Sequence, residues 1–232
     1  MNEDLIVYLG ASIGRVRASF ILPDAQYHAP VQAGDFEKLM TVPRTMVILD
    51  GTYTPELEQQ VANLIQAGVH VYGASALGAL LAAKLEPIGM KGLGAIYRRF
   101  LSGYYQGDRV LGCELALSKN GYRRSTEPLV NIYATMDHAV LGNALDTSMS
   151  GIIVAAAEAL PDSQRTFENI FVEAQKRGID QHILVEFSNW VNNGGYIDQQ
   201  RQDACMVLNR VVYDMKTETL FDKNFYDQGV LI

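Results

Sequence analysis

The sequence predicts an α/β protein with a mostly parallel sheet core and a C-terminal helical region. Short, nearly continuous apolar runs recur in the first third of the chain, as in strands that are buried on both faces of a parallel sheet. The segment between two of these runs has the apolar spacing of a helix, which makes a strand-helix-strand unit. Beyond Asp146 the pattern changes to a series of helices separated by proline and glycine.

Three apolar runs are predicted to be strands. They are residues 5–9 (LIVYL), 46–49 (MVIL) and 69–72 (VHVY), and each is followed by a small or polar turn. Because a helical segment joins the second and third runs, we expect those two strands to be parallel.

The joining segment, residues 55–67, is predicted to be an amphipathic helix. Leu57 and Val61 recur on one face, and Gly68 is placed to end the helix. Residues 76–85 follow the third strand and are apolar on nearly all sides, which predicts a buried helix.

The remainder of the chain is predicted to be mainly helical. The expected helices are residues 95–101, 128–145, 150–160, 167–177, 181–191 and 199–215. We therefore expect an α/β core over residues 1–145 and a helical region over residues 146–232 that packs on this core.

Composition and charge exclude several classes of function. The net charge is -7 and no dense run of lysine and arginine occurs, so no nucleic-acid partner is expected. The longest mostly apolar run, residues 69–83, is shorter than the roughly 20 residues that a membrane span needs. The acidic N-terminus enters a strand at once and does not resemble a signal peptide. These features predict a cytoplasmic protein without a membrane partner.

The pattern of cysteine and histidine predicts neither a disulfide framework nor a metal site. The two cysteines lie far apart, and the four histidines show no spacing typical of metal ligands. We expect no metal and no cofactor.

Polar residues follow each of the three predicted strands. Gly10 and Ser12 follow the first strand, Asp50 the second and Ser75 the third. Ligands of open parallel sheets bind outside the carboxyl ends of the strands, so Gly10, Ser12 and Asp50, together with Gly73 and Ala76 on either side of Ser75, are candidate binding residues. The alternative is ordinary turn chemistry, because serine and aspartate are also good helix N-caps.

Ser75 is the strongest candidate nucleophile. Gly73 permits a sharp turn, and backbone N–H groups from Ala76 onward, at the start of a helix, can stabilise an oxyanion. The turn resembles a nucleophile elbow, but the spacing from Gly73 to Gly78 is one residue too long for GxSxG. The same spacing occurs in phosphate-binding loops, but Ala79 stands where such loops have lysine. A capping role for Ser75 remains the alternative.

A serine nucleophile needs a base, and the sequence offers one candidate lysine. Lys84 lies about 13 Å further along the same helix and on its other side. His70 lies five residues before Ser75 on the same strand, which is too far away. Lys91, in a glycine-rich segment, could fold back over the strand ends; the alternative is an exposed loop lysine.

The segments GAS at residues 73–75, GMKGLG at 89–94 and EPLVNI at 127–132 form a fairly specific set. Together they resemble the TfuA family, the companion proteins of YcaO enzymes. The order and spacing also fit at residues 10–12, 22–25, 30, 34–35, 48–51, 69–80 and 197–204. The resemblance therefore covers most of the chain.

This resemblance implies a role in peptide backbone thioamidation, a post-translational modification in RiPP biosynthesis. It implies hydrolysis of the thiocarboxylate of a ubiquitin-like sulfur carrier similar to ThiS. The released sulfide is then used by the YcaO-type partner enzyme, which activates the peptide amide with ATP. The precursor peptide is an indirect partner.

The resemblance also implies a serine-lysine pair, in which the serine corresponds to Ser75. The lysine has no counterpart, because Gln200 stands where family members often have lysine. A basic residue is also often found just before Gly34, where this chain has Ala33. An uncharged amide is not a base near neutral pH.

Three hypotheses follow for the function. The first is a serine-type hydrolase of a protein thiocarboxylate, with Lys91 as base. The second is a non-catalytic adaptor that scaffolds the YcaO enzyme, the sulfur carrier and the precursor peptide. The third is a small-molecule-binding domain that uses the crevice near Ser12 and Asp50.

Overall fold

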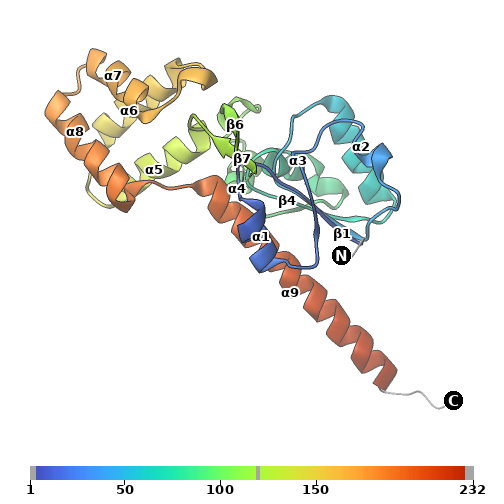
Figure 1. The fold of residues 1–232 in the computed structure, drawn as a ribbon. Coiled ribbons are helices and arrows are strands. Elements are labelled where there is room, and N and C mark those ends of the chain that lie inside the picture. The colour runs from blue at the N-terminus through green and yellow to red at the C-terminus, as the bar shows by residue number, and fades with distance from the viewer. Residues whose placement is uncertain (1–3, 119–120, 228–232) are drawn as a thin grey trace.

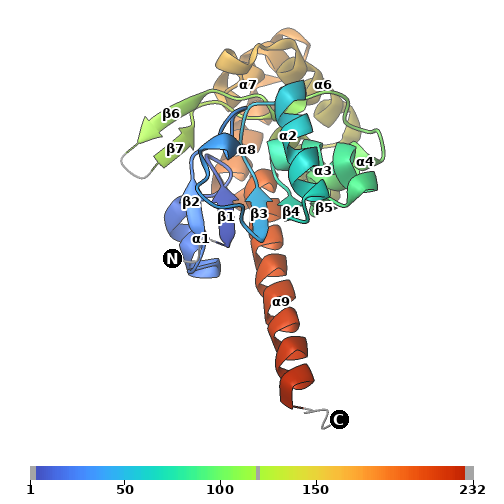
Figure 2. The ribbon, with the colours of Figure 1, turned by 90° about the vertical axis from the view of Figure 1, so that its right-hand side faces the viewer.

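A sheet of five parallel strands forms the centre of the protein. The computed structural model describes residues 4–118 and 121–227. The strands lie in the order β2-β1-β3-β4-β5, which can be followed in Figure 2. Their bounds are β1 Leu5–Tyr8, β2 Gln26–His28, β3 Thr45–Ile48, β4 His70–Gly73 and β5 Lys91–Gly92. The three strands predicted from the apolar runs are confirmed as the three central strands, where both faces are buried.

Helices cover both faces of the sheet. On one face, α1 (Arg15–Ile21) and α9 (Gln199–Asp227) pack against Leu5 and Val7 of β1. On the other face, α2 (Pro55–Gln66) and α3 (Leu77–Leu85) pack against the alternate side chains of that strand. The three-layer arrangement is visible in Figures 1 and 2. The α/β fold class is therefore confirmed.

The two helices predicted beside the central strands are also confirmed. Helix α2 begins after Thr54, whose hydroxyl accepts a hydrogen bond from the N–H of Leu57 at 3.0 Å, and Pro55 occupies its first turn. Helix α3 is buried along most of its length, as its continuous apolar sequence predicts.

Some elements were not predicted from the sequence. They are α1, the edge strands β2 and β5, and a β-hairpin of β6 (Leu115–Ser118) and β7 (Gly121–Arg124). The edge strands have only three and two residues and are not fully buried, so they show no continuous apolar run.

Four helices form a second core beside the sheet. They are α5 (Leu129–Leu141), α6 (Thr147–Ala159), α7 (Phe167–Lys176) and α8 (Gln181–Trp190), and α4 (Ala95–Leu101) lies between this core and α3. Figure 1 shows α5–α8 grouped on one side of the α/β layers. The expected boundary at residue 145 falls between α5 and α6, which pack on each other. Helix α9, expected in the helical region, returns to the sheet and supplies one of its layers.

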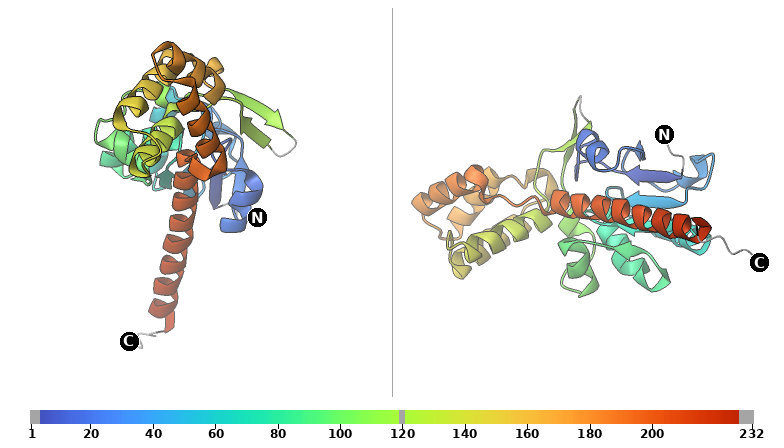
Figure 3. Two further views of the ribbon diagram at one scale, coloured as in Figure 1. Left: turned by 90° about the vertical axis from the view of Figure 1, so that its left-hand side faces the viewer. Right: turned by 90° about the horizontal axis from the view of Figure 1, so that it is seen from below.

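Helix α9 is the longest helix and runs beyond the remainder of the protein. Its first half contributes Ala204, Val207, Leu208 and Val211 to the core against the sheet. Figure 3 shows its C-terminal half projecting past the other elements. Among the residues that the structure describes, no helix is long and apolar enough to cross a membrane.

Candidate functional site

The three polar residues that follow the central strands meet in one hydrogen-bonded chain. The hydroxyl of Ser75 donates to the hydroxyl oxygen of Ser12 at 2.6 Å, and Ser12 donates to Oδ1 of Asp50 at 2.6 Å. Strands β1, β3 and β4 are neighbours in a parallel sheet, so their carboxyl ends bring these residues to one edge. The exposed fractions are 0% for Ser75, 1% for Ser12 and 8% for Asp50.

Asp50 also holds the loop that carries Ser12. Its Oδ2 accepts hydrogen bonds from the N–H groups of Gly10 at 2.7 Å and Ser12 at 3.4 Å. A Cβ at Gly10 would lie 2.7 Å from Cγ of Pro30 and 3.2 Å from Cβ of Asp50, so only glycine allows this close approach. Burial raises the pKa of the Asp50 carboxyl, opposed by its hydrogen bonds and by the nearby charge of Arg124.

Ser75 occupies a strained turn between β4 and α3. Its φ is +73°, in the left-handed region that residues with a Cβ rarely adopt. The turn packs tightly, because a Cβ at Gly73 or Gly78 would lie less than 3.0 Å from a backbone oxygen. Strain of this kind in a buried polar residue is a feature of functional sites.

The start of α3 offers fewer free N–H groups than the sequence implied. The N–H groups of Ala76 and Gly78 both donate to the carbonyl oxygen of Leu49, at 3.3 and 3.2 Å. Ala76 is therefore not a free oxyanion donor, although it lines the cavity described below. Leu77 is the first residue of α3, where helix geometry provides no intrahelical acceptor for its N–H.

An open cavity of about 580 Å³ lies beside the hydrogen-bonded chain. Asp50, Ala76 and Leu77 form one side of it, and Cys113 and Tyr122, from the segment that leads into the hairpin and from β7, form the other. Ser75 lies behind this wall, in contact with Ser12. The cavity is large enough to hold the end of a peptide chain or a small molecule.

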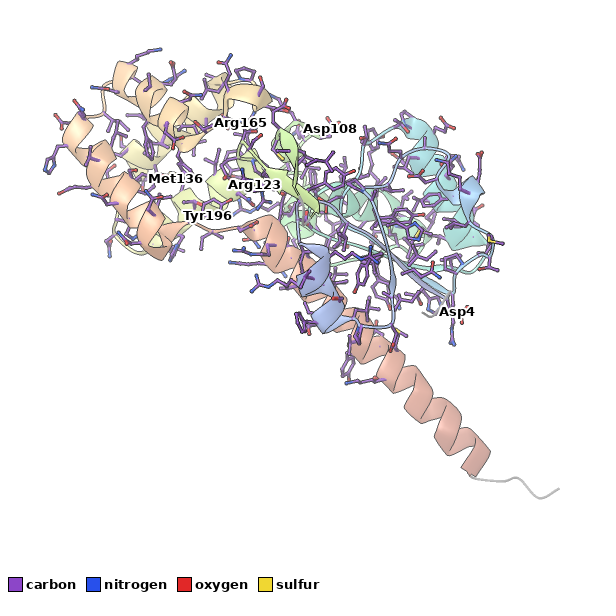
Figure 4. All side chains as sticks on the ribbon, viewed as in Figure 1. Asp4, Asp108, Arg123, Met136, Arg165 and Tyr196 are labelled. Carbon is purple, nitrogen blue, oxygen red and sulfur yellow. The ribbon has the colours of Figure 1, made fainter. Side chains whose placement is uncertain are left out.

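The opposite side of the cavity continues to the junction with the helical core. Asp108 lines it, and Figure 4 labels Asp108 near this junction. Burial raises the pKa of the Cys113 thiol to about 12, so this cysteine stays protonated and is a poor nucleophile near neutral pH.

Lys91 does not lie with Ser75. It pairs in register with Tyr72, and its Nζ donates to the Tyr72 hydroxyl at 3.1 Å and lies 3.8 Å from the carboxylate of Asp214 on α9. Tyr72 precedes Ser75 by three residues, about 10 Å along the strand. The structure therefore places Lys91 beside α9, in an ion pair.

Lys84 is also engaged elsewhere, as its position along the helix predicted. Its Nζ lies 2.8 Å from the carboxylate of Glu58 and 5.0 Å from the ring centre of Tyr53. Neither Lys91, the candidate base, nor Lys84, which its position along the helix excluded as a base, forms a hydrogen bond or ion pair with Ser75, Ser12 or Asp50.

Arg124 is the cation next to the site, and sequence reasoning missed it. Its Nη1 donates to Oε1 of Gln200 at 2.6 Å, and its Nη2 contacts the carboxylate of Asp198. Gln200 lines the cavity and is 2% exposed. Burial alone would lower the pKa of Arg124, but the charges of Asp198, Tyr196 and Glu127 and the hydrogen bond to Asp198 together raise it. Arg124 on β7 meets Asp198 and Gln200, at the start of α9, only in the folded chain, so no local sequence signal could have identified these contacts.

In residues 4–118 and 121–227, no group of three or more histidine, cysteine, aspartate or glutamate side chains could hold a metal ion.

Comparison with known families adds one match. A family model described as TfuA-like protein matches residues 50–166, half of the chain. The matched segment begins at Asp50 and contains Ser75, Lys91 and Arg124, whereas Ser12 lies before it. A comparison with curated proteins gave no match.

Proposed function

Because the chain belongs to the TfuA-like protein family, we propose that it hydrolyses the thiocarboxylate of a ThiS-like sulfur carrier and supplies sulfide to a YcaO-type enzyme of peptide backbone thioamidation. One observation carries the proposal. Ser75 is a buried serine in a left-handed conformation, at the N-terminus of a buried helix and in hydrogen-bond contact with Ser12. This arrangement supports a serine nucleophile.

The reaction needs a serine oxygen, a place for the developing negative charge and a water molecule. Oγ of Ser75 attacks the acyl carbon at the carrier's terminus, the C–S bond breaks, and hydrosulfide leaves. Water then hydrolyses the acyl-serine ester and releases a carrier that ends in a carboxylate. The N–H of Leu77, on the cavity wall, is the candidate donor to the oxyanion.

The neighbouring cavity suits an extended chain end. It is open to solvent and bounded in part by Asp50 and Ala76, which lie just beyond the carboxyl ends of β3 and β4. Ser75 is fully buried, so the proposal requires this wall to open when the carrier binds.

Sulfide release from a thiocarboxylated carrier tests the proposal. We expect Ser75→Ala to lower the single-turnover rate by at least about a hundredfold, because the nucleophile is lost. Ser102→Ala, which removes an exposed hydroxyl that bonds only the carbonyl of Arg99, is the matched control and should react at the wild-type rate. Equal rates for wild type and Ser75→Ala would show that Ser75 is not the nucleophile.

A non-catalytic adaptor is the second candidate function. Two observations favour it: Gln200, an amide, lines the cavity, and Ser75 has no exposed surface. An adaptor would increase the affinity of the YcaO enzyme for the precursor peptide, and Ser75→Ala would leave thioamidation in a reconstituted system unchanged. Loss of thioamidation in Ser75→Ala, with peptide affinity retained, would exclude this function.

A further inference from the structure

The hydrogen bonds that link Ser75, Ser12 and Asp50 run in one direction, with each hydroxyl donating to the next residue toward Asp50. A carboxylate accepts hydrogen bonds and does not donate, so Ser12 must donate its proton to Oδ1 of Asp50. The lone pairs of Ser12 are then available to accept the proton of Ser75, at an Oγ–Oγ distance of 2.6 Å. The proton of Ser75 therefore points away from the cavity, and a lone pair of its oxygen is left for attack.

Asp50 is held rigidly for this role. The two N–H groups of Gly10 and Ser12 fix Oδ2, which leaves Oδ1 for the hydroxyl of Ser12. All three side chains of the chain are buried, so little bulk water competes for these hydrogen bonds. The charge of Arg124 acts on Asp50 and favours the carboxylate.

The surrounding cations do not supply a base. Lys84 is paired with Glu58, and Lys91 with Tyr72 and Asp214. Arg124 keeps its proton at every ordinary pH. Asp50 is thus the proton acceptor that the geometry connects to Ser75.

We propose that Ser12 and Asp50 form a proton relay that deprotonates Ser75, in place of a lysine. As Oγ of Ser75 bonds to the acyl carbon, its proton moves to Oγ of Ser12, and the proton of Ser12 moves to Oδ1 of Asp50. When the C–S bond breaks, the electron pair leaves with sulfur, and the proton held by Asp50 passes through Ser12 to the departing sulfur, which leaves as hydrosulfide. The inference rests on the proposed function, because it assigns the base for the same nucleophile.

The variant Asp50→Asn tests the relay without releasing the loop. The backbone N–H groups of Gly10 and Ser12 require an oxygen at the Oδ2 position, so the amide nitrogen must face Ser12. Ser12 would then accept from residue 50 and donate to Ser75, which reverses the chain and removes the base. Ser12→Ala interrupts the chain, and Ser12→Thr keeps the hydroxyl.

The decisive comparison uses two nucleophiles. A thiol is a stronger acid than a serine hydroxyl, so a cysteine at position 75 depends less on a base. We expect Asp50→Asn to slow single-turnover sulfide release by about a hundredfold or more in the wild-type background and by less than about tenfold in the Ser75→Cys background. A purely structural role for Asp50 predicts the same loss in both backgrounds and would overturn the relay.

Labelling of Ser75 by a small fluorophosphonate, located by mass spectrometry, measures the nucleophilicity of the serine without a carrier. The relay predicts slow labelling in Ser12→Ala and Asp50→Asn, with labelling restored in Ser12→Thr. Wild-type labelling rates in the first two variants would contradict it. The two proposals fail separately. Wild-type sulfide release by Ser75→Ala would show that Ser75 is not the nucleophile. An inactive Ser75→Ala together with fully active Ser12→Ala and Asp50→Asn would exclude only the relay. Thermal unfolding of each variant checks that it is folded.

Discussion

At the scale of residues, the site combines a strained backbone with a buried acid. Ser75 has a φ of +73°, and its hydroxyl donates a hydrogen bond to Ser12, which lies in the loop that Asp50 holds. Both features cost folding free energy, so they are maintained by the packing around them. Stability measurements can therefore detect each of them without any substrate.

The buried carboxyl of Asp50 predicts a pH dependence of stability. Burial raises its pKa in the folded state above the ordinary value of 3.8, so the native protein keeps a proton that the unfolded chain has already released. The contribution of Asp50 to the free energy of unfolding is therefore largest below pH 3.8 and falls as the pH rises through the raised pKa. Urea unfolding from pH 4 to 8 measures the free energy of unfolding of wild type and of Asp50→Asn. We expect the value for wild type minus the value for Asp50→Asn to fall as the pH rises, and an increase with pH would contradict the prediction.

The close approach at Gly78 predicts a sensitive position. A Cβ there would lie less than 3.0 Å from the carbonyl oxygen of Ile48, which is backbone and cannot move away easily. We expect Gly78→Ala to lower the free energy of unfolding by about 1–3 kcal/mol. Gly151→Ala is the matched control, because that helical glycine has no heavy atom within 4 Å of the added methyl group, and the change should stabilise α6 by about 0.5–1 kcal/mol. Equal stabilities of the two variants would refute the packing argument.

At the scale of elements, α9 fixes other parts of the protein through single side chains. Asp203, fully buried on α9, accepts hydrogen bonds from the N–H groups of Ala95 at 3.0 Å and Ile96 at 2.8 Å, the first residues of α4. Gly94 has a φ of +100° and packs directly against this carboxylate. A side chain from another helix thus caps α4, in place of a local N-cap residue.

This interhelical cap predicts a large effect of one substitution. Asp203→Ala leaves the buried N–H of Ile96 and the partly buried N–H of Ala95 without this acceptor, so we expect a loss of about 2 kcal/mol in the free energy of unfolding. Asp180→Ala removes an exposed cap that accepts from the N–H of His182, and it should cost about 1 kcal/mol or less. Chemical denaturation of both variants makes the comparison, and an equal cost would show that burial of the cap does not matter.

At the scale of the whole molecule, Arg165 joins the helical core to the cavity wall. Its fully buried guanidinium donates to the carbonyl oxygens of Ala157, Leu160, Gly112 and Glu127 and to the carboxylate of Asp162. Gly112 lines the cavity, so this one side chain connects α6 with the site. Figure 4 labels Arg165 near this junction.

The position of Arg165 predicts that its replacement affects both the helical core and the cavity wall. We expect Arg165→Met to lower the free energy of unfolding by about 3 kcal/mol or more, because several carbonyl groups lose their donor. Amide hydrogen exchange should also become faster across residues 112–127. Arg177→Met, which removes an exposed ion pair with Glu173, should change stability by less than about 1 kcal/mol. Unchanged exchange rates in Arg165→Met would show that the cavity wall does not depend on this side chain.

The sequence predicted the parts of the fold whose burial leaves a local pattern. Strands β1, β3 and β4 are buried on both faces, and their apolar runs were recognisable, whereas β2 and β5 are short edge strands without such a pattern. The meeting of Ser12, Asp50 and Ser75 followed from strand topology. The direction of their hydrogen bonds and the partners of Lys91 and Arg124 depend on contacts between distant segments, so the sequence did not reveal them.

The place of α9 in the fold has a consequence for synthesis on the ribosome. Strand β1 is synthesised long before α9, but the apolar face that it shares with β3 and β4 is covered by residues 204–211 of α9. Until that segment emerges, the growing chain exposes this face to other molecules. Stalling translation before residue 204 should therefore produce nascent chains that bind chaperones, and chains whose residues 204–211 have left the ribosome should be released.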